Sequence, residues 1–72
     1  MDRTPERPGE RVEADLRRRI AAGEWQADEM MPTVAEFAGH YGVSPGVITR
    51  VLRRLAADGL VRTVPRWGTF RA

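Results

Sequence analysis

Residues 42–61 read GVSPGVITRVLRRLAADGLV, and this stretch decides the fold that the sequence predicts. Ser44 is a favourable helix N-cap, and Pro45 follows at the first helical position, where its missing N–H costs nothing. Four apolar residues then recur at helical spacing, namely Ile48, Val51, Leu52 and Leu55. The opposite face carries small residues and arginines, namely Gly46, Thr49, Arg50, Arg53 and Ala57, with Arg54 beside them. The stretch predicts an amphipathic helix from Pro45 to about Asp58, ended by Gly59.

Two shorter helices are predicted upstream of this one. The first spans about residues 10–22 and is ended by Gly23, because every fourth residue is apolar, namely Val12, Leu16 and Ile20. The second follows Thr33, since Thr33 and Glu36 have the spacing of a capping box, and it runs to about Tyr41. Gly42, Val43 and Ser44 leave a turn of only three residues before the next helix.

The remaining segments are predicted to be less regular. Residues 1–9 hold two prolines and little apolar content, so we expect a disordered arm. Residues 24–32 form a connector with three apolar residues that should pack onto the core, namely Trp25, Met30 and Met31. A short strand is expected over residues 29–31. Residues 60–64 and 69–72 are rich in β-formers and flank a Pro/Gly turn, which predicts a hairpin.

Three helices followed by a hairpin, with a short turn between the second and third helices, predict a winged helix-turn-helix. The fold class is mainly α with a small β wing, and residues 10–72 form one domain. The predicted core gathers the apolar positions of every element, namely Val12, Leu16, Ile20, Phe37, Ala38, Ile48, Val51, Leu52, Leu55, Leu60 and Phe70.

Composition excludes several classes of protein. A chain of 72 residues leaves little material beyond one core, so we do not expect an enzyme. There is no cysteine, and His40 is the only histidine, so neither a disulfide framework nor a zinc site is expected. We also expect no cofactor, because no glycine-rich phosphate loop is present. No apolar run suits a membrane span or a signal peptide, which favours a cytoplasmic, nucleoid-associated protein.

Charge points to a polyanionic partner. All twelve basic residues are arginines. Residues 50–72 carry six of them against one acid, Asp58, a balance of +5, whereas residues 1–49 carry six against nine acids, a balance of −3. Arginine pairs well with phosphate oxygens and with guanine edges, so the basic C-terminal third suits a polyanion such as nucleic acid. The alternative, which charge alone favours equally, is a solvated charged face in an arginine-rich proteome.

The geometry of the predicted fold gives these residues roles on double-stranded DNA. The major groove admits one helix, and the helix over residues 45–58 offers small residues at its start for close approach. Arg50 and Arg53 are expected at base edges, and Arg54, Arg62 and Arg66 at phosphates. The wing over residues 60–72 is expected on the flanking backbone or minor groove. The full set of expected contact residues is Thr33, Ser44, Pro45, Gly46, Val47, Thr49, Arg50, Arg53, Arg54, Arg62, Arg66, Trp67, Gly68 and Thr69. The alternative is a winged-helix module that binds another protein without reading bases.

The chain resembles the N-terminal DNA-binding domain of the GntR family of bacterial transcription regulators. The resemblance covers residues 11–72 and rests on five ordered motifs: residues 20–23 (IAAG), 31–33 (MPT), 38–44 (AGHYGVS), 47–61 (VITRVLRRLAADGLV) and 68–70 (GTF). The family commonly reads bases with arginines at positions that are here Ala35, Pro45 and Thr49. Either Arg50 takes over that role or phosphate contacts dominate. Arg66 replaces the first glycine of the family's wing, and Trp67 follows it.

The resemblance also has implications for assembly. Family members continue past the wing into a domain that binds an effector and dimerises. This chain stops at Ala72, so we expect either a truncated protein or a stand-alone small regulator that binds no small-molecule effector itself. It should be a monomer in dilute solution and bind one half-site of a pseudo-palindromic operator, or two half-sites as a dimer on DNA.

Overall fold

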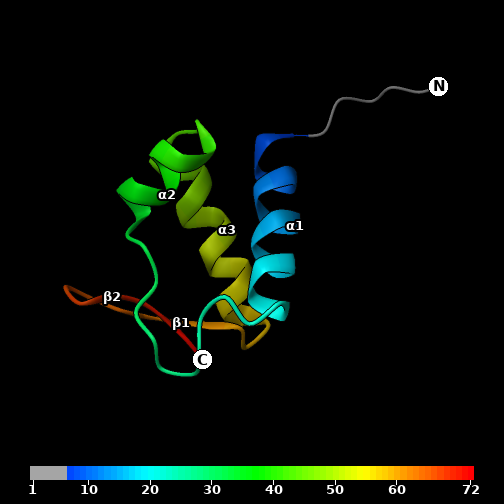
Figure 1. Ribbon diagram of the computed structural model, residues 1–72. Helices are drawn as coiled ribbons and strands as arrows, with labels where there is room; N and C mark the ends of the chain where they lie inside the picture. The colour runs from blue at the N-terminus through cyan, green and yellow to red at the C-terminus, as the bar shows by residue number, and fades with distance from the viewer. Residues whose placement is uncertain (1–6) are drawn as a thin grey trace.

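The computed structural model describes residues 7–72 and contains three helices and one hairpin (Figure 1). The elements are α1 (Pro8–Ala21), α2 (Val34–Tyr41), α3 (Pro45–Ala57), β1 (Val61–Val64) and β2 (Gly68–Arg71). The strands pair antiparallel, with Val61 opposite Arg71 and Val64 opposite Gly68. The architecture is that of a winged helix-turn-helix, as predicted.

The helix starts follow their sequence signals. The Glu36 backbone N–H donates to Thr33 Oγ1 at 3.1 Å, and the Thr33 N–H donates to Glu36 Oε1 at 2.8 Å, which completes the capping box of α2. Ser44 Oγ accepts from the Val47 N–H at 3.4 Å at the start of α3. Gly42 ends α2 with φ of 68°, a left-handed conformation that glycine adopts without steric cost.

Helix α1 begins earlier than predicted. Pro8 occupies its first position and Gly9 its second, so these two residues are helical rather than part of a disordered arm. The reason is that proline at a helix start lacks an N–H that would have no partner there. The rest of the expected arm, residues 1–6, lies outside the described residues.

The core lies where the three helices and β1 meet. Its buried members are Val12, Leu16, Ile20, Trp25, Met31, Phe37, Ala38, Ile48, Val51, Leu52, Leu55 and Val61. Nine of the eleven predicted core residues are among them. Leu60 is partly buried against this cluster, but Phe70 is half-buried outside it, so its assignment to the core was wrong. Phe70 lies on β2 beneath the Arg62 guanidinium, 5.4 Å from the ring centroid, which covers it from outside.

The connector between α1 and α2 is hydrogen-bonded to β2, the second strand of the hairpin. Trp25 and Met31 are buried as expected, whereas Met30 is 53% exposed and forms a single bridge with Phe70 in place of a strand. The Asp28 N–H donates to the Arg71 carbonyl at 2.7 Å, and the Arg71 N–H donates to the Glu29 carbonyl at 2.9 Å. The connector therefore borders β2 and ties it to the helical body.

Polar contacts fasten α1 to the other two helices. The Tyr41 hydroxyl donates to Asp15 Oδ2 at 2.6 Å, and Arg19 Nη1 donates to the Tyr41 hydroxyl oxygen at 2.9 Å. The bond from Tyr41 lowers the pKa of Asp15, while burial raises the pKa of Tyr41. On the other side, Arg17 donates to both Glu13 and Asp58, which links α1 to the C-terminal end of α3.

Candidate nucleic-acid interface

The outer face of α3 is open to solvent. Because its apolar stripe packs toward α1 and α2, the opposite face remains exposed, with Gly46, Thr49, Arg50, Arg53 and Ala57 on it. Neither Arg50 nor Arg53 forms a hydrogen bond or an ion pair within residues 7–72. Two guanidinium groups and a stretch of small side chains are thus available to an external ligand on one helix face.

The N-termini of α2 and α3 carry exposed polar groups. Thr33, Ser44 and Pro45 are exposed. The hydroxyls of Thr33 and Ser44 accept capping bonds, which leaves each O–H free to donate. A phosphate oxygen is a suitable acceptor there, because a helix N-terminus also favours negative charge.

Val47 lies at the edge of the open face rather than on it. Its side chain is half-buried and packs against the core, and a methyl group of Val47 is close to the position that a side chain on Gly9 would take. The expectation of a DNA contact at Val47 therefore conflicts with its orientation toward the start of α1.

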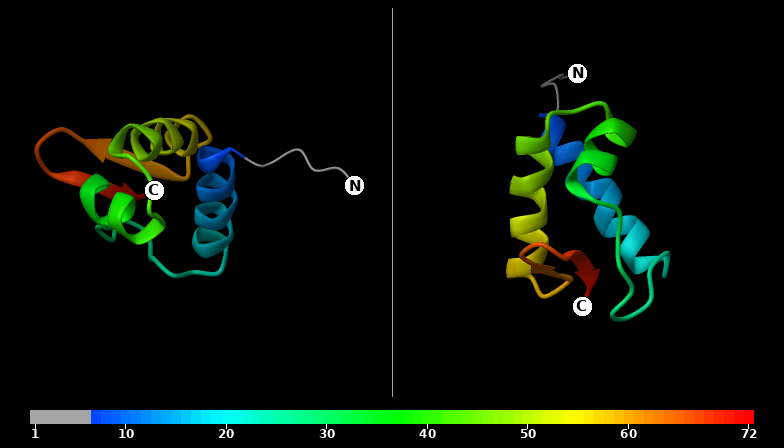
Figure 2. Two further views of the ribbon diagram at one scale, coloured as in Figure 1. Left: turned by 90° about the horizontal axis from the view of Figure 1, so that it is seen from above. Right: turned by 90° about the vertical axis from the view of Figure 1, so that its left-hand side faces the viewer.

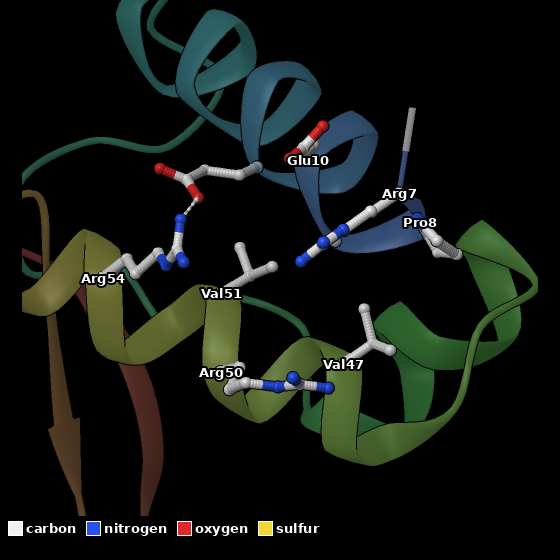
Figure 3. A pocket seen from close by; sticks show the side chains of 9 residues that line it. Arg7, Pro8, Glu10, Val47, Arg50, Val51 and Arg54 are labelled. Carbon is white, nitrogen blue, oxygen red and sulfur yellow. Dashed lines mark hydrogen bonds and ion pairs between the residues drawn. The ribbon is translucent and has the colours of Figure 1, made fainter. Parts of the chain in front are cut away.

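Between α3 and the start of α1 lies a groove of about 260 Å³, shown in Figure 3. Its floor includes Val47 and Val51, and arginines line it from both elements, namely Arg7, Arg50 and Arg54. Arg7 was not among the predicted contact residues. The sequence feature that could have identified Arg7 is its position directly before Pro8, a proline that starts a helix.

Arg54 and Arg62 are paired with carboxylates. Arg54 contacts Glu13 of α1 at 3.3 Å, and Arg62 contacts Asp28 of the connector at 3.1 Å. Both arginines remain more than half exposed. Ion pairs in water contribute little to stability, so a phosphate can replace either carboxylate at small cost.

The turn of the wing is its most exposed part, and it projects beyond the helices (Figure 2). Arg66 has φ of 70° and no partner within the described chain, and Trp67 is 71% exposed. Gly68 is half-buried, and Thr69 is only 4% exposed. Thr69 was expected to contact DNA, but its side chain is in the interior because it lies on the same face of the hairpin as Val61, which belongs to the core.

Other kinds of site find no support in the described residues. Within residues 7–72, no three histidine or acidic side chains are grouped as a metal site requires. None of the helices in that range is long and apolar enough to cross a membrane.

The hairpin packs beside a three-helix body, and the outer face of α3 is open and bears arginines. These two features define a winged helix-turn-helix domain of the kind found in regulatory proteins. Residues 8–70 match the family described as "Bacterial regulatory proteins, gntR family". The chain belongs to this family, whose members are described as regulatory proteins.

Two curated regulators show the relationship in sequence. The HTH-type transcriptional regulator TreR of Bacillus subtilis is 30% identical over 50 residues, which cover 69% of this chain and 21% of TreR. An HTH-type transcriptional regulator of Mycobacterium tuberculosis is 35% identical over 51 residues, which cover 71% of this chain and 42% of that protein. The chain thus spans less than half the length of these relatives.

Solved structures show the relationship in three dimensions. The DNA-binding domain of AraR in complex with operator ORE1 has a TM-score of 0.93 and 26% identity, covering 100% of this chain and 88% of that one. A transcriptional regulator from Oenococcus oeni has a TM-score of 0.82 and 26% identity, covering 100% of this chain and 61% of that one.

Proposed function

We propose that this chain is the DNA-reading domain of a bacterial transcriptional regulator and binds double-stranded operator DNA with sequence specificity. Helix α3 enters the major groove, and the wing lies on the flanking backbone or minor groove. The observation that carries this proposal is the outer face of α3, where Arg50 and Arg53 extend from a surface of small residues without partners in residues 7–72.

The chemistry of this face suits base recognition. Gly46 and Thr49 let the helix backbone approach the groove floor closely, because neither side chain is large. Arg50 and Arg53 then reach base edges, where a guanidinium donates two parallel hydrogen bonds to guanine O6 and N7. Relatives of the same fold have been solved in complex with operators, which supports duplex DNA as the ligand.

Phosphate contacts surround the base-reading face. Ser44 and Thr33 offer hydroxyl donors at helix N-termini on one side, and Arg54 lies on the other. Arg62 and Arg66 extend the positive charge along the wing. These contacts fix the position of α3 on the duplex and contribute affinity that does not depend on sequence.

The mode of assembly follows from the small size of the surface. We expect one domain to cover one half-site, so a pseudo-palindromic operator binds two domains about one helical turn apart. Binding to a half-site requires no small molecule on this chain. The place of action is the bacterial cytoplasm, on the nucleoid.

The proposal is tested by fluorescence anisotropy with a duplex selected from a random pool and with a scrambled duplex. Arg50→Ala should cost about 1–3 kcal/mol on the selected duplex and little on the scrambled one. Log affinity should fall linearly with log salt, with a slope of about −0.9 for each neutralised phosphate. Arg18→Ala is the matched control, because Arg18 is exposed and pairs with Asp15 of its own helix.

Two results would contradict the proposal. If Arg50→Ala and Arg53→Ala leave affinity unchanged, α3 does not read the duplex. If no duplex binds even at low salt, the domain serves instead as a protein-interaction module.

A further inference from the structure

The turn of the wing carries a large aromatic side chain, Trp67. The Trp67 backbone N–H donates to the Val64 carbonyl at 3.0 Å, which closes the turn through Pro65 and Arg66. The Trp67 side chain is 71% exposed, although the strand pair on either side is regular. Figures 1 and 2 show this turn extending away from the helical body.

The surroundings of Trp67 do not resemble an apolar docking surface. Met30 is the other exposed large hydrophobic residue in the described chain, and it lies on the connector rather than in the turn. Arg66 lies in the turn directly before Trp67 and is exposed. The Arg62 guanidinium, in contrast, lies over Phe70 and pairs with a carboxylate of the connector. An exposed indole that follows an exposed arginine in the same turn suits a polyanion with apolar walls. The minor groove of DNA has this character, with phosphates at its rim and sugars along its sides.

We propose that Trp67 enters the minor groove beside the half-site and favours A·T base pairs there. This inference rests on the proposed function, since it requires the domain to be seated on duplex DNA. The minor groove is about 6 Å wide, which admits a planar ring between the sugar walls. Trp67 thereby makes the wing a reader of sequence in addition to α3.

The preference for A·T follows from the donor chemistry of indole. Its Nε1–H donates a hydrogen bond and accepts none. In the minor groove, A·T and T·A pairs present only acceptors, adenine N3 and thymine O2, whereas G·C adds the guanine N2 amino donor. Against G·C, the indole N–H faces another donor, and the amino group also blocks deep entry.

Arg66 holds this arrangement in place electrostatically. Its guanidinium has no partner within the described residues, and it precedes Trp67 directly. A narrow A·T-rich minor groove has an enhanced negative potential that attracts arginine. Arg66 and Trp67 therefore favour the same flanking sequence for different physical reasons.

The test compares three duplexes that share the selected central site and differ only in the flanks, which are A·T, G·C or inosine·C. Inosine·C has the major groove of G·C but lacks the N2 amino group. The unaltered protein should bind the A·T and inosine·C duplexes roughly 3- to 10-fold more tightly than the G·C duplex, the range expected for one neutral hydrogen bond.

Two variants assign the effect to the indole. Trp67→Phe keeps an aromatic ring but loses the N–H donor. The ratio of its affinity for A·T or inosine·C flanks to its affinity for G·C flanks should therefore fall toward one. Trp67→Ala should reduce the preference for A·T flanks to the smaller preference that Arg66 alone contributes. Urea unfolding should show that both variants retain the parent's stability, because an exposed side chain contributes little to the core.

The fluorescence of Trp67 also reports whether its side chain is accessible to solvent. The emission of the parent minus that of Trp67→Phe isolates Trp67 from the buried Trp25, which is 7% exposed. On A·T-flanked duplex, this difference signal should become shielded from acrylamide.

The inference is overturned if inosine·C flanks behave like G·C, if Trp67→Ala keeps the full A·T preference of the parent, or if Trp67 stays open to acrylamide on the duplex. These outcomes are distinct from failure of the proposed function, in which the unaltered protein binds none of the three duplexes.

Discussion

Arg66 adopts a backbone conformation that suits glycine better than arginine. Its φ of 70° is left-handed, which costs a residue with a Cβ roughly 1–2 kcal/mol. We predict that the free energy of unfolding of Arg66→Gly exceeds that of Arg66→Ala by about 1 kcal/mol, because only glycine relieves this strain. Both variants lose the same charge, so both should weaken duplex binding alike and flatten the salt slope by about one. Equal stability of the two variants would show that the turn is not strained.

Asp15 makes the stability of the domain sensitive to acid. The hydrogen bond from Tyr41, aided by the charge of Arg18, lowers the pKa of Asp15 below its ordinary value of 3.8 despite opposing burial. The unfolded chain therefore binds the proton more readily than the native one, so this stabilisation is full above the unfolded pKa and is lost as pH falls through the folded pKa. Tyr41→Phe should lose less stability than the parent when urea unfolding is repeated from pH 5 to about pH 3. The prediction fails if the two proteins lose stability in parallel.

Glu24 contributes in the same direction and serves as an internal comparison. The hydrogen bond from Arg19 lowers the pKa of Glu24 below 4.5. Tyr41→Phe leaves this pair in place, so the variant should retain some acid sensitivity, whereas Tyr41→Phe combined with Glu24→Gln should retain less.

At the scale of elements, α3 anchors the fold through one apolar stripe. Leu52 is 4% exposed, and Ile48 and Leu55 are fully buried beside it. Leu52→Ala should lower the free energy of unfolding by roughly 2–5 kcal/mol, since it removes a transfer term and leaves a cavity. Arg53→Ala on the opposite face is the control and should change stability little. Urea unfolding followed by tryptophan emission measures the stability of both variants. A Leu52→Ala transition close to the parent's would mean that the stripe is not in the core.

Local signals in the sequence were sufficient to place the helices. Thr33, Glu36 and Ser44 act through backbone groups only three residues away, so their capping roles can be predicted without knowledge of the fold. The start of α1 was missed because Pro8 is equally common in irregular segments, and only packing of the helix start near Val47 decides the case.

The candidate site was less predictable because it depends on contacts between distant residues. The pairs Arg54–Glu13 and Arg17–Asp58 are each separated by 41 residues, and periodicity contains no information about them. Thr69 was misplaced for the same reason. Alternation along a strand gives two faces, but only the packing of the hairpin against the helices determines which one is buried.

The whole molecule offers little apolar surface for self-association. Among residues 7–72, the exposed large hydrophobic side chains are Met30 and Trp67, which lie on different segments. We predict that light scattering at micromolar concentration gives the monomer mass of 8.1 kDa. A second copy should appear only on a duplex with two half-sites, because the DNA then brings the domains together. A stable dimer of about twice that mass without DNA would contradict this prediction.

The connector that borders β2 has a consequence for the thermodynamics of binding. Because backbone hydrogen bonds from Asp28, Met31 and Arg71 fix the hairpin to the body, the loss of conformational entropy in placing the wing occurs during folding and not on DNA. The distance between α3 and the turn that carries Trp67 is therefore fixed before the domain binds DNA. The wing cannot swing to follow an A·T flank that is shifted by one base pair. The operator should therefore tolerate little change in the spacing between its A·T flank and the site that α3 reads.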